Sequence, residues 1–325
     1  MLLVFASVIL VIAIDYYPID VANALGPLGV VFAAAICWVA IATVALYFAL
    51  RYRIPIFTAA ALGLVVFSYF NDNHAIGSVP GGAPKRIRIR AAFNEWAAAK
   101  LRANTSNPNR IPIFVVAAEG GGIRAAYWTA TVLAQLQSRY PQFASHTFAI
   151  SSVSGGSLGA ATFLAALTER PAGRQIVGRS RAMLTQDFLA PLLGRLLFSD
   201  LIQQFVPVPV VRDRARAIEN SWERSWGSPA FHDPFCRLWT RAPKGDVPNL
   251  MMNGTIVETG QRVIVSNLDI ANDLDDTQDG LRLIEGDTSL ACAIHLSARF
   301  TYVSPAGLIR PRGRPRGDWR HVVDG

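Results

Sequence analysis

The N-terminal part of the chain is dominated by apolar positions. No charged residue stands between Leu28 and Leu50, and a helix of about 20 apolar residues crosses the roughly 30 Å hydrocarbon core of a bilayer. Shorter apolar segments lie on either side, over residues 1–14 and 54–70. The pattern predicts a multi-pass membrane region of about three apolar segments over residues 1–70.

Beyond this region, short apolar runs alternate with helical patterns. The runs at 111–118 and 147–153 are typical of buried strands, and each precedes a stretch of helical spacing, at 124–137 and 155–168. Strand, helix, strand, helix in this order predicts an α/β fold with a parallel sheet. Further strands are predicted at 250–257, 262–266 and 320–323, and further helices at 93–101 and 289–299.

These patterns divide the chain into three parts. Residues 1–70 form the transmembrane region, and residues 71–110 form a linker and lead-in helix that includes the Gly/Pro-rich stretch 77–84. Residues 111–325 are long enough for one sizeable core, so we expect a single α/β domain there.

The distribution of charge favours a lipid partner over a nucleic acid. The chain is 51% hydrophobic with a formal net charge of +8, and only Arg51 and Arg53 among its basic residues precede residue 71. The excess of positive charge therefore lies in the α/β part. Next to an apolar anchor, such a surface is expected to face anionic lipid. We expect no nucleic-acid partner, and the sequence points to no protein partner.

The side of the membrane that holds the α/β part is not decided by the charges. Arg51 and Arg53 place the end of the second apolar segment in the cytoplasm by the positive-inside rule. A basic cluster follows the third apolar segment, at Lys85, Arg86, Arg88 and Arg90. By the same rule it places the end of the third segment in the cytoplasm as well. The two indications exclude each other if the third segment crosses the membrane.

A glycine-rich turn follows the first predicted strand. Gly120, Gly121 and Gly122 stand between that strand and a helical pattern that includes Arg124. Consecutive glycines allow a tight turn that leaves backbone amides near a helix N-terminus, where negative charge is favoured. Such amides are what a tetrahedral oxyanion needs. The alternatives are a phosphate-binding loop and a plain tight turn. The glycines lack both the G-x-G-x-x-G spacing of dinucleotide sites and the G-K-[ST] ending of a P-loop.

A serine-rich turn follows the second predicted strand. The strict G-x-S-x-G pattern is centred on Ser157, whereas Ser154 stands directly after the strand, where Ser152 replaces the first glycine. A nucleophilic serine needs the sharp turn between strand and helix, which favours Ser154. Ser157 is the alternative nucleophile. Gly156 belongs to the same turn, which could also be a mere small-residue start of a helix.

With these motifs, the domain resembles the patatin-like phospholipases, of the bacterial membrane-anchored kind. The resemblance covers about residue 111 to the end and rests on the G-G-G-x-R loop, on Ser154 and on the D-G pair Asp324 and Gly325. It departs from the family at Glu119, where aspartate is common, and at Ser152. Family members continue beyond the D-G pair, so the resemblance implies a C-terminally incomplete domain.

The resemblance implies a three-layer hydrolase fold and a Ser-Asp dyad. Ser154 would attack the ester carbonyl of a membrane lipid, Asp324 would take the serine proton, and Gly120, Gly121 and Gly122 would form the oxyanion hole. Arg124 and Gly156 would support the site. No cofactor or metal is implied, and the location expected is the bacterial inner membrane. A carboxylate is a weak base, so burial should raise the pKa of Asp324.

Two other functions stay open. A Ser-His-Asp esterase would take its base from His295 or His321 and its acid from one of three carboxylates, Asp269, Asp273 and Asp287. The order of its triad along the chain would be serine, acid, histidine. The other function is a non-catalytic, membrane-anchored lipid-binding protein with a degenerate hydrolase fold.

Three further features belong to the sequence pattern. Residues 188–211 are strongly apolar with near-helical spacing, as expected of a packed core segment or of a lid that dips into the bilayer. Four arginines alternate with Pro and Gly before Asp324, at Arg310, Arg312, Arg314 and Arg316, and could touch lipid phosphates. The three cysteines are far apart, which predicts neither disulfides nor a metal site.

Overall fold

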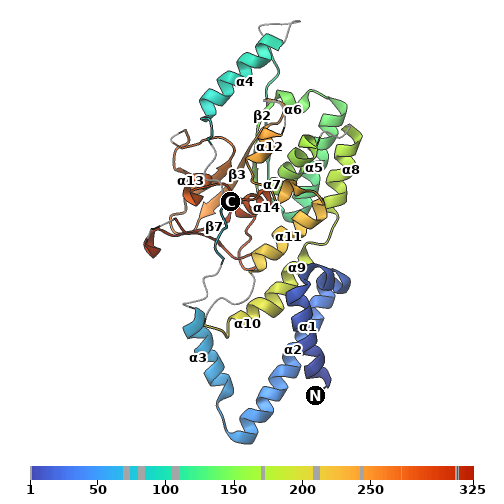
Figure 1. Cartoon of the computed structure of the whole chain (residues 1–325), viewed down its shortest axis with the longest axis vertical. Helices are drawn as coiled ribbons and strands as arrows, with labels where there is room; N and C mark the ends of the chain where they lie inside the picture. The colour runs from blue at the N-terminus through green and yellow to red at the C-terminus, as the bar shows by residue number, and fades with distance from the viewer. Residues whose placement is uncertain are drawn as a thin grey trace. The chain divides into compact units, whose positions relative to one another are not determined.

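The structure, a computed structural model, describes residues 2–68, 74–79, 85–103, 110–169, 173–207, 213–241, 245–271, 273–311, 313 and 315–325. It contains two compact units, each interrupted in sequence. The helical unit comprises Met1–His74 and Asp187–Ser221, and the α/β unit comprises Ala75–Gln186 and Trp222–Gly325 (Figure 1). Part of the Gly/Pro-rich linker, the end of the apolar segment 188–211, and Arg312 and Arg314 lie outside the described residues.

The helical unit begins with three apolar helices, α1 (Leu2–Tyr16), α2 (Pro18–Tyr52) and α3 (Ile56–Ser68). A break at Gly26, with φ 69°, divides α2 just before Pro27, where a helix-interior proline removes a hydrogen bond. Of the helices in the described residues, α2 alone is long and apolar enough to cross a membrane. With 15 and 13 residues, α1 and α3 are shorter than the 17 or so that a span needs.

The apolar segment that follows residue 187 packs against these helices. It forms α9 (Leu189–Gly194), a π-helical turn (Arg195–Asp200) and α10 (Leu201–Gln203). Its Ala190 and Phe198 share a buried cluster with side chains of α1 and α2, namely Ile14, Ala22, Val30, Ala34 and Cys37. The inward side chains of this segment therefore pack in the core of the helical unit.

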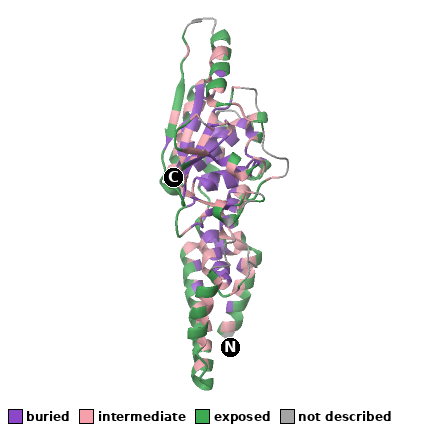
Figure 2. Cartoon of the chain, turned by 90° about the vertical axis from the view of Figure 1, so that its left-hand side faces the viewer, coloured by how far each residue is buried: buried purple, intermediate pink, exposed green. Residues whose placement is uncertain are grey.

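A mixed sheet forms the centre of the α/β unit, and its strands come in the order β1, β2, β3, β4, β5. Their bounds are Phe114–Ala118, Thr147–Val153, Asn249–Ile256, Arg262–Ser266 and Thr277–Asp279. Most buried positions of the unit lie in and around this sheet (Figure 2). β1, β2 and β3 are parallel, as the alternating pattern predicts, and β4 and β5 are parallel to each other.

The parallel pairing predicted from the sequence is confirmed for β1, β2 and β3, but β4 pairs with β3 in antiparallel orientation. Only a few residues join the two strands, and a short connection can only form an antiparallel pair. β7 (Arg320–Asp324) also pairs antiparallel, with β3 and with β6 (Gly307–Ile309). The structure thus supports a mixed α/β fold.

The register along β3 determines which residues meet at its edge. β2 pairs with Asn249 to Asn253 of β3, and β7 pairs with Gly254 to Ile256. Since β4 pairs with β3 over Met251 to Thr255, it occupies the other edge, and β2 and β7 must share one. Along β3, the residues paired with β7 therefore follow directly after the residues paired with β2.

Helices pack on the sheet and on one another. α7 (Gly155–Thr168) contacts β1, β2 and β3, and α5 (Gly122–Arg139) packs on α7 and on α8 (Gly173–Leu184). α14 (Leu290–Leu296) contacts α7, β3 and β7. α4 (Ile89–Ala103) adds Trp96 to a core cluster with Phe148 of β2.

Shorter elements complete the description. They are α6 (Phe143–His146), α12 (Arg237–Thr240), α13 (Gly280–Ile284) and the 3-10 turns Pro229–Phe231 and Arg316–Asp318. α11 (Arg214–Trp226) contains the point at which the chain returns to the α/β unit.

Close packing of α7 on α5 predicts a strong effect of one methyl group. A Cβ at Gly159 would lie 2.4 Å from the Ala126 carbonyl oxygen and 2.8 Å from Thr129 Cβ. We expect Gly159→Ala to cost about 1–3 kcal/mol of stability, measured as a lower melting temperature. Gly178→Ala in α8, where nothing lies within 4 Å, is the control and should be neutral or stabilising. Equal melting temperatures of the two variants would contradict the packing.

Candidate active site

Ser154 occupies the sharp turn between β2 and α7. β2 ends at Val153 and α7 begins at Gly155, so the serine belongs to neither element. Its backbone has φ 53° and ψ −128°, a combination that residues with a side chain rarely adopt because it is strained. Such strained turns at the end of a strand are typical of nucleophile elbows, where they expose the hydroxyl.

The glycines around Ser154 are required by backbone contacts. A Cβ on Gly155 would lie 1.9 Å from the carbonyl oxygen of Gly122, and one on Gly156 would lie 2.5 Å from that of Ala118. Neither position has room for any side chain. The turn after β2 is therefore packed, backbone to backbone, against the turn after β1.

The predicted oxyanion loop is the other side of this contact. Gly120 lies beside the serine: a Cβ built on it would be 3.0 Å from Ser154 Cβ and 3.6 Å from its Oγ. Gly121 and Gly122 have positive φ angles of 137° and 59°, which favour glycine. All three glycines are exposed. Among the loop and cap hydrogen bonds of the described residues, none is donated by the amides of Gly120 or Gly121.

Asp324 meets Ser154 directly. β2 ends its pairing at Asn253 of β3, and Asp324, the last residue of β7, pairs with the next residue, Gly254. Asp324 therefore lies next to the turn between β2 and α7. Ser154 Oγ donates a hydrogen bond of 2.7 Å to Asp324 Oδ2, and the Gly325 amide donates one of 3.0 Å to Oδ1. The two residues are 170 positions apart in sequence.

Burial changes the proton affinity of this carboxylate. Desolvation of the half-buried side chain raises the pKa of Asp324 above its usual value, against the opposing effects of the hydrogen bonds from Ser154 and from the Gly325 amide. A carboxylate with a raised pKa is a better proton acceptor than an exposed one. The direction agrees with the one that the dyad interpretation requires.

Ser157 lies elsewhere, in a buried chain of hydroxyl groups. Its side chain is fully buried, and its Oγ is 2.9 Å from Ser152 Oγ and 2.8 Å from Ser297 Oγ. Ser297 Oγ in turn donates to the Asn253 carbonyl oxygen at 2.5 Å. The strict sequence pattern thus points to a serine that joins α7 to β3 and α14, away from solvent.

Sequence reasoning missed the residues that hold Ser154 in place. The Ser154 amide donates to the Ser297 carbonyl at 2.8 Å, and the Asp324 amide donates to the Arg299 carbonyl at 3.0 Å. Asn253 Nδ2 donates to the Ser152 carbonyl at 2.9 Å. These are contacts between distant segments, and no motif in the sequence marks them. Arg124, predicted as a supporting residue, is exposed at the first turn of α5.

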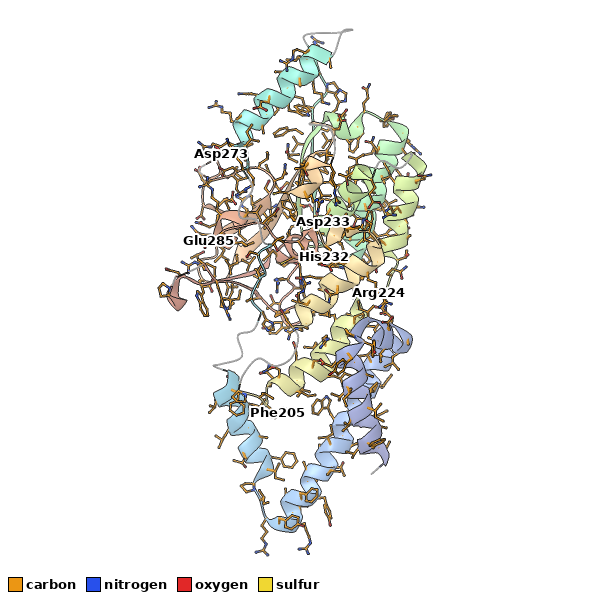
Figure 3. All side chains as sticks on the ribbon, in the orientation of Figure 1. Phe205, Arg224, His232, Asp233, Asp273 and Glu285 are labelled. Atoms are coloured by element: carbon orange, nitrogen blue, oxygen red, sulfur yellow. The ribbon has the colours of Figure 1, made fainter. Side chains whose placement is uncertain are left out.

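The histidines considered for a triad have other partners. His295 is fully buried, with Nε2 2.5 Å from Ser304 Oγ, and His321 Nδ1 lies 2.6 Å from Glu258 Oε1. Among the candidate acids, Asp269 pairs with Arg282, Asp273 (Figure 3) pairs with Arg88, and Asp287 accepts the amides of Cys236 and Thr288. The hydrogen-bond geometry therefore favours a dyad over a triad. Within the described ranges, no three His, Cys, Asp or Glu side chains gather as a metal site would require.

Comparisons with known proteins add little to this geometry. No protein-family model and no characterised protein sequence matches the chain. Among solved structures, VipD from Legionella pneumophila is similar over 70% of this chain and 51% of its own, with 12% identity and a TM-score of 0.28. The chain thus spans about half the length of VipD. A likeness at this level supports no conclusion about function.

The raised pKa of Asp324 predicts a pH-dependent effect on stability. The stabilisation that it reflects is fully present below the unfolded-state pKa, about 3.9, and is lost as the pH rises through the folded-state pKa. We therefore expect Asp324→Asn, which carries no charge, to melt at a higher temperature than the parent at neutral pH. The difference should shrink toward acidic pH.

Asp269→Asn is the control with the opposite sign. Burial raises the pKa of Asp269, but hydrogen bonds from Arg282 and from the Ala271 amide outweigh burial and lower it overall. The stability that this carboxylate contributes is present above its unfolded-state pKa and is lost as the pH falls through the folded-state pKa. This variant should melt lower than the parent at neutral pH. The same sign of effect for both variants at neutral pH would contradict the interpretation.

Proposed function

We propose that the chain is a membrane-anchored serine acyl hydrolase of the patatin-like phospholipase type, which cleaves fatty-acyl esters of membrane lipids. The hydrogen bond of 2.7 Å between Ser154 Oγ and Asp324 Oδ2 is the observation that carries the proposal. It joins a strained elbow serine to a carboxylate of raised pKa, beside a loop of glycine amides. The patatin-like three-layer domain expected over residues 111–325 would correspond to the α/β unit, Ala75–Gln186 and Trp222–Gly325.

In this mechanism Asp324 takes the proton of Ser154 as Oγ attacks the ester carbonyl. The carbonyl oxygen becomes an oxyanion, which the amides of the Gly120 to Gly122 loop stabilise. One such donor typically contributes about 3 kcal/mol to lowering the barrier. Collapse of the tetrahedral intermediate expels the alcohol, which receives the proton from Asp324. Water then attacks the acyl-enzyme while Asp324 takes its proton. The acyl–Oγ bond breaks, Asp324 returns the proton to Ser154 Oγ, and the fatty acid leaves.

A loop of exposed aromatic residues beside the dyad supports a lipid substrate. The backbone carbonyl of Ser297 accepts a hydrogen bond from the Ser154 amide, and that of Arg299 accepts one from the Asp324 amide. The next residues of the chain include Phe300 and Tyr302, whose side chains are 64% and 90% exposed. Aromatic side chains on a surface that approaches a bilayer suit the interface between headgroups and acyl chains.

This aromatic loop, residues 298–304, is held firmly at its base. The buried Arg299 donates to the Pro305 carbonyl at 2.8 Å, and the Ser304 amide donates to the Phe300 carbonyl at 2.8 Å. Ser304 Oγ also contacts the buried His295. These bonds hold the base of the aromatic loop next to the residues that bond Ser154 and Asp324.

Membrane anchoring is supported by α2, which has the length and apolar composition of a span. The formal net charge of +8 favours anionic lipid surfaces. A multi-pass anchor in a bacterial inner membrane stays part of the proposal, as does the absence of a metal or cofactor from the chemistry.

Serine variants test the proposal. The parent should hydrolyse nitrophenyl esters of short fatty acids and react with a fluorophosphonate probe at one serine. Ser154→Ala should abolish both, because among the described residues Ser154 is the hydroxyl that donates to Asp324. Ser157→Ala is the matched control: it shortens the buried hydroxyl chain, costs about 1 kcal/mol of stability and should keep the labelling. Labelling that survives Ser154→Ala and is lost in Ser157→Ala would overturn the assignment.

The aromatic loop is tested by comparing two substrates. We expect Phe300→Ser with Tyr302→Ser to lower hydrolysis of phospholipid vesicles about tenfold, which corresponds to about 1.4 kcal/mol. Hydrolysis of a water-soluble short-chain ester should stay near the parent rate, because the dyad is intact. An equal loss on both substrates would show that the loop supports the dyad and not the lipid interface. Tyr140→Ser, at another exposed aromatic, is the control.

A further inference from the structure

The apolar segment that interrupts the sequence of the α/β unit has no role in the chemistry proposed above. We propose that residues 187–206 lie in the hydrocarbon of the membrane beside α2, and that they give the catalytic unit a second anchor. The partner is the bilayer itself. This proposal rests on the membrane anchoring proposed above and adds to it the element that holds the α/β unit.

The depth of the segment follows from one hydrogen bond. Trp38 Nε1 in α2 donates to the Leu197 carbonyl at 2.8 Å. Along a helix, Trp38 lies about 15 Å from Leu28, where the uncharged stretch begins, and the hydrocarbon core is roughly 30 Å thick. If α2 crosses the membrane, Leu197 therefore lies near the middle of the hydrocarbon.

Small side chains bring the segment close to the N-terminal helices. Ala190 packs in a buried cluster with Val30 and Ala34 of α2. Gly194 leaves so little space that an added Cβ would lie 3.3 Å from Ile14 Cγ2 and 3.6 Å from Ala22 Cβ. Interfaces of small residues that let helices approach closely are typical of packing inside membranes, where the hydrophobic effect no longer drives association.

Two charged groups of the segment, Arg195 and Asp200, are paired, as a hydrocarbon environment demands. The Arg195 side chain is 3% exposed and forms an ion pair with Asp15. It also donates to the Asp15 carbonyl at 2.7 Å and to Ser199 Oγ at 3.3 Å. Asp200 pairs with Arg214. Ionised groups inside a membrane are tolerated when they pair with one another and with backbone carbonyls.

The most exposed side chains of the segment are apolar. Leu189, Leu201 and Phe205 (Figure 3) are 47%, 38% and 42% exposed. These side chains and the exposed apolar side chains of α1 and α2 present apolar area that costs about 25 cal/mol per Å² in water. Lipid removes this cost.

The route of the chain makes the segment an anchor for catalysis. The sequence leaves the α/β unit after Gln186 and returns to it at Trp222. The chain thus passes between the α/β unit and the helical unit three times, and the first passage, at Ala75, lies within the predicted linker, residues 71–110. Cutting that linker should leave the catalytic unit attached through the other two.

A protease site inserted between Asn71 and Asp72 of the full chain tests this. The protein in phospholipid vesicles is cut and washed with concentrated salt and with alkaline carbonate. We expect the fragment that carries Ser154 to stay with the vesicles. Its release into the wash would overturn the proposal. Loss of the uncut protein in the same wash would instead refute the anchoring proposed above, and fluorophosphonate labelling reports separately on the dyad.

A variant pair shows whether the contact with α2 is what holds the fragment. Phe198 is fully buried in the cluster with α1 and α2. Phe198→Asp should increase the released fraction several-fold after cutting, whereas Phe198→Leu should behave like the parent. Labelling of the released fragment shows that the α/β unit is folded, and equal retention of both variants would contradict the role of this contact.

A probe of the uncut parent protein covers the case in which the aspartate variant does not fold. A photoreactive group carried in the lipid acyl chains should label peptides from residues 187–206 as well as peptides from α2. Labelling that includes α2 and leaves residues 187–206 unmodified would overturn the proposal.

Discussion

One edge of β3 is the constraint from which the candidate site follows. β2 pairs with the first part of this edge and β7 with the last part, without a gap between Asn253 and Gly254. The residue that leaves β2 therefore comes to lie beside the residue that ends β7. Ser154 and Asp324 approach to hydrogen-bond distance because of backbone pairing, without a dedicated binding loop. The strain at Ser154 is maintained by the same pairing and by the glycine contacts with the turn after β1.

The local elements of the fold could be read from the sequence because each has a clear pattern. β2, α7 and β4 have the bounds that the apolar runs and glycines predict. The direction of β4 could not be read from the alternation of strands and helices, since only the short connection after β3 makes it antiparallel. The short strands β5 and β6 have three residues each, too few to produce a periodic pattern.

The site was predictable where a motif constrains the backbone and hidden where distant segments meet. Gly120, Gly156 and Ser154 are marked by their neighbours in sequence, because tight turns demand glycine. Ser297 and Arg299 are not marked in this way, because they contribute backbone carbonyls that accept hydrogen bonds. Every residue has a carbonyl, so the sequence does not distinguish them. Ser157 fits the strict pattern and yet is buried, because a residue one turn into a helix faces the sheet. The contact between residues 187–203 and the first helices also depends on tertiary packing that no local pattern shows.

The attachment of β7 has a consequence for how the molecule would fail. This strand of five residues pairs with three residues of β3 and three of β6, a small part of the whole fold. Short elements with few bonds open more readily than the core around them. Fraying of β7 would withdraw Asp324, the proposed proton acceptor, and relax the serine turn while the rest of the sheet stayed intact. Loss of function would then precede melting, so the working state would be more fragile than the architecture that carries it.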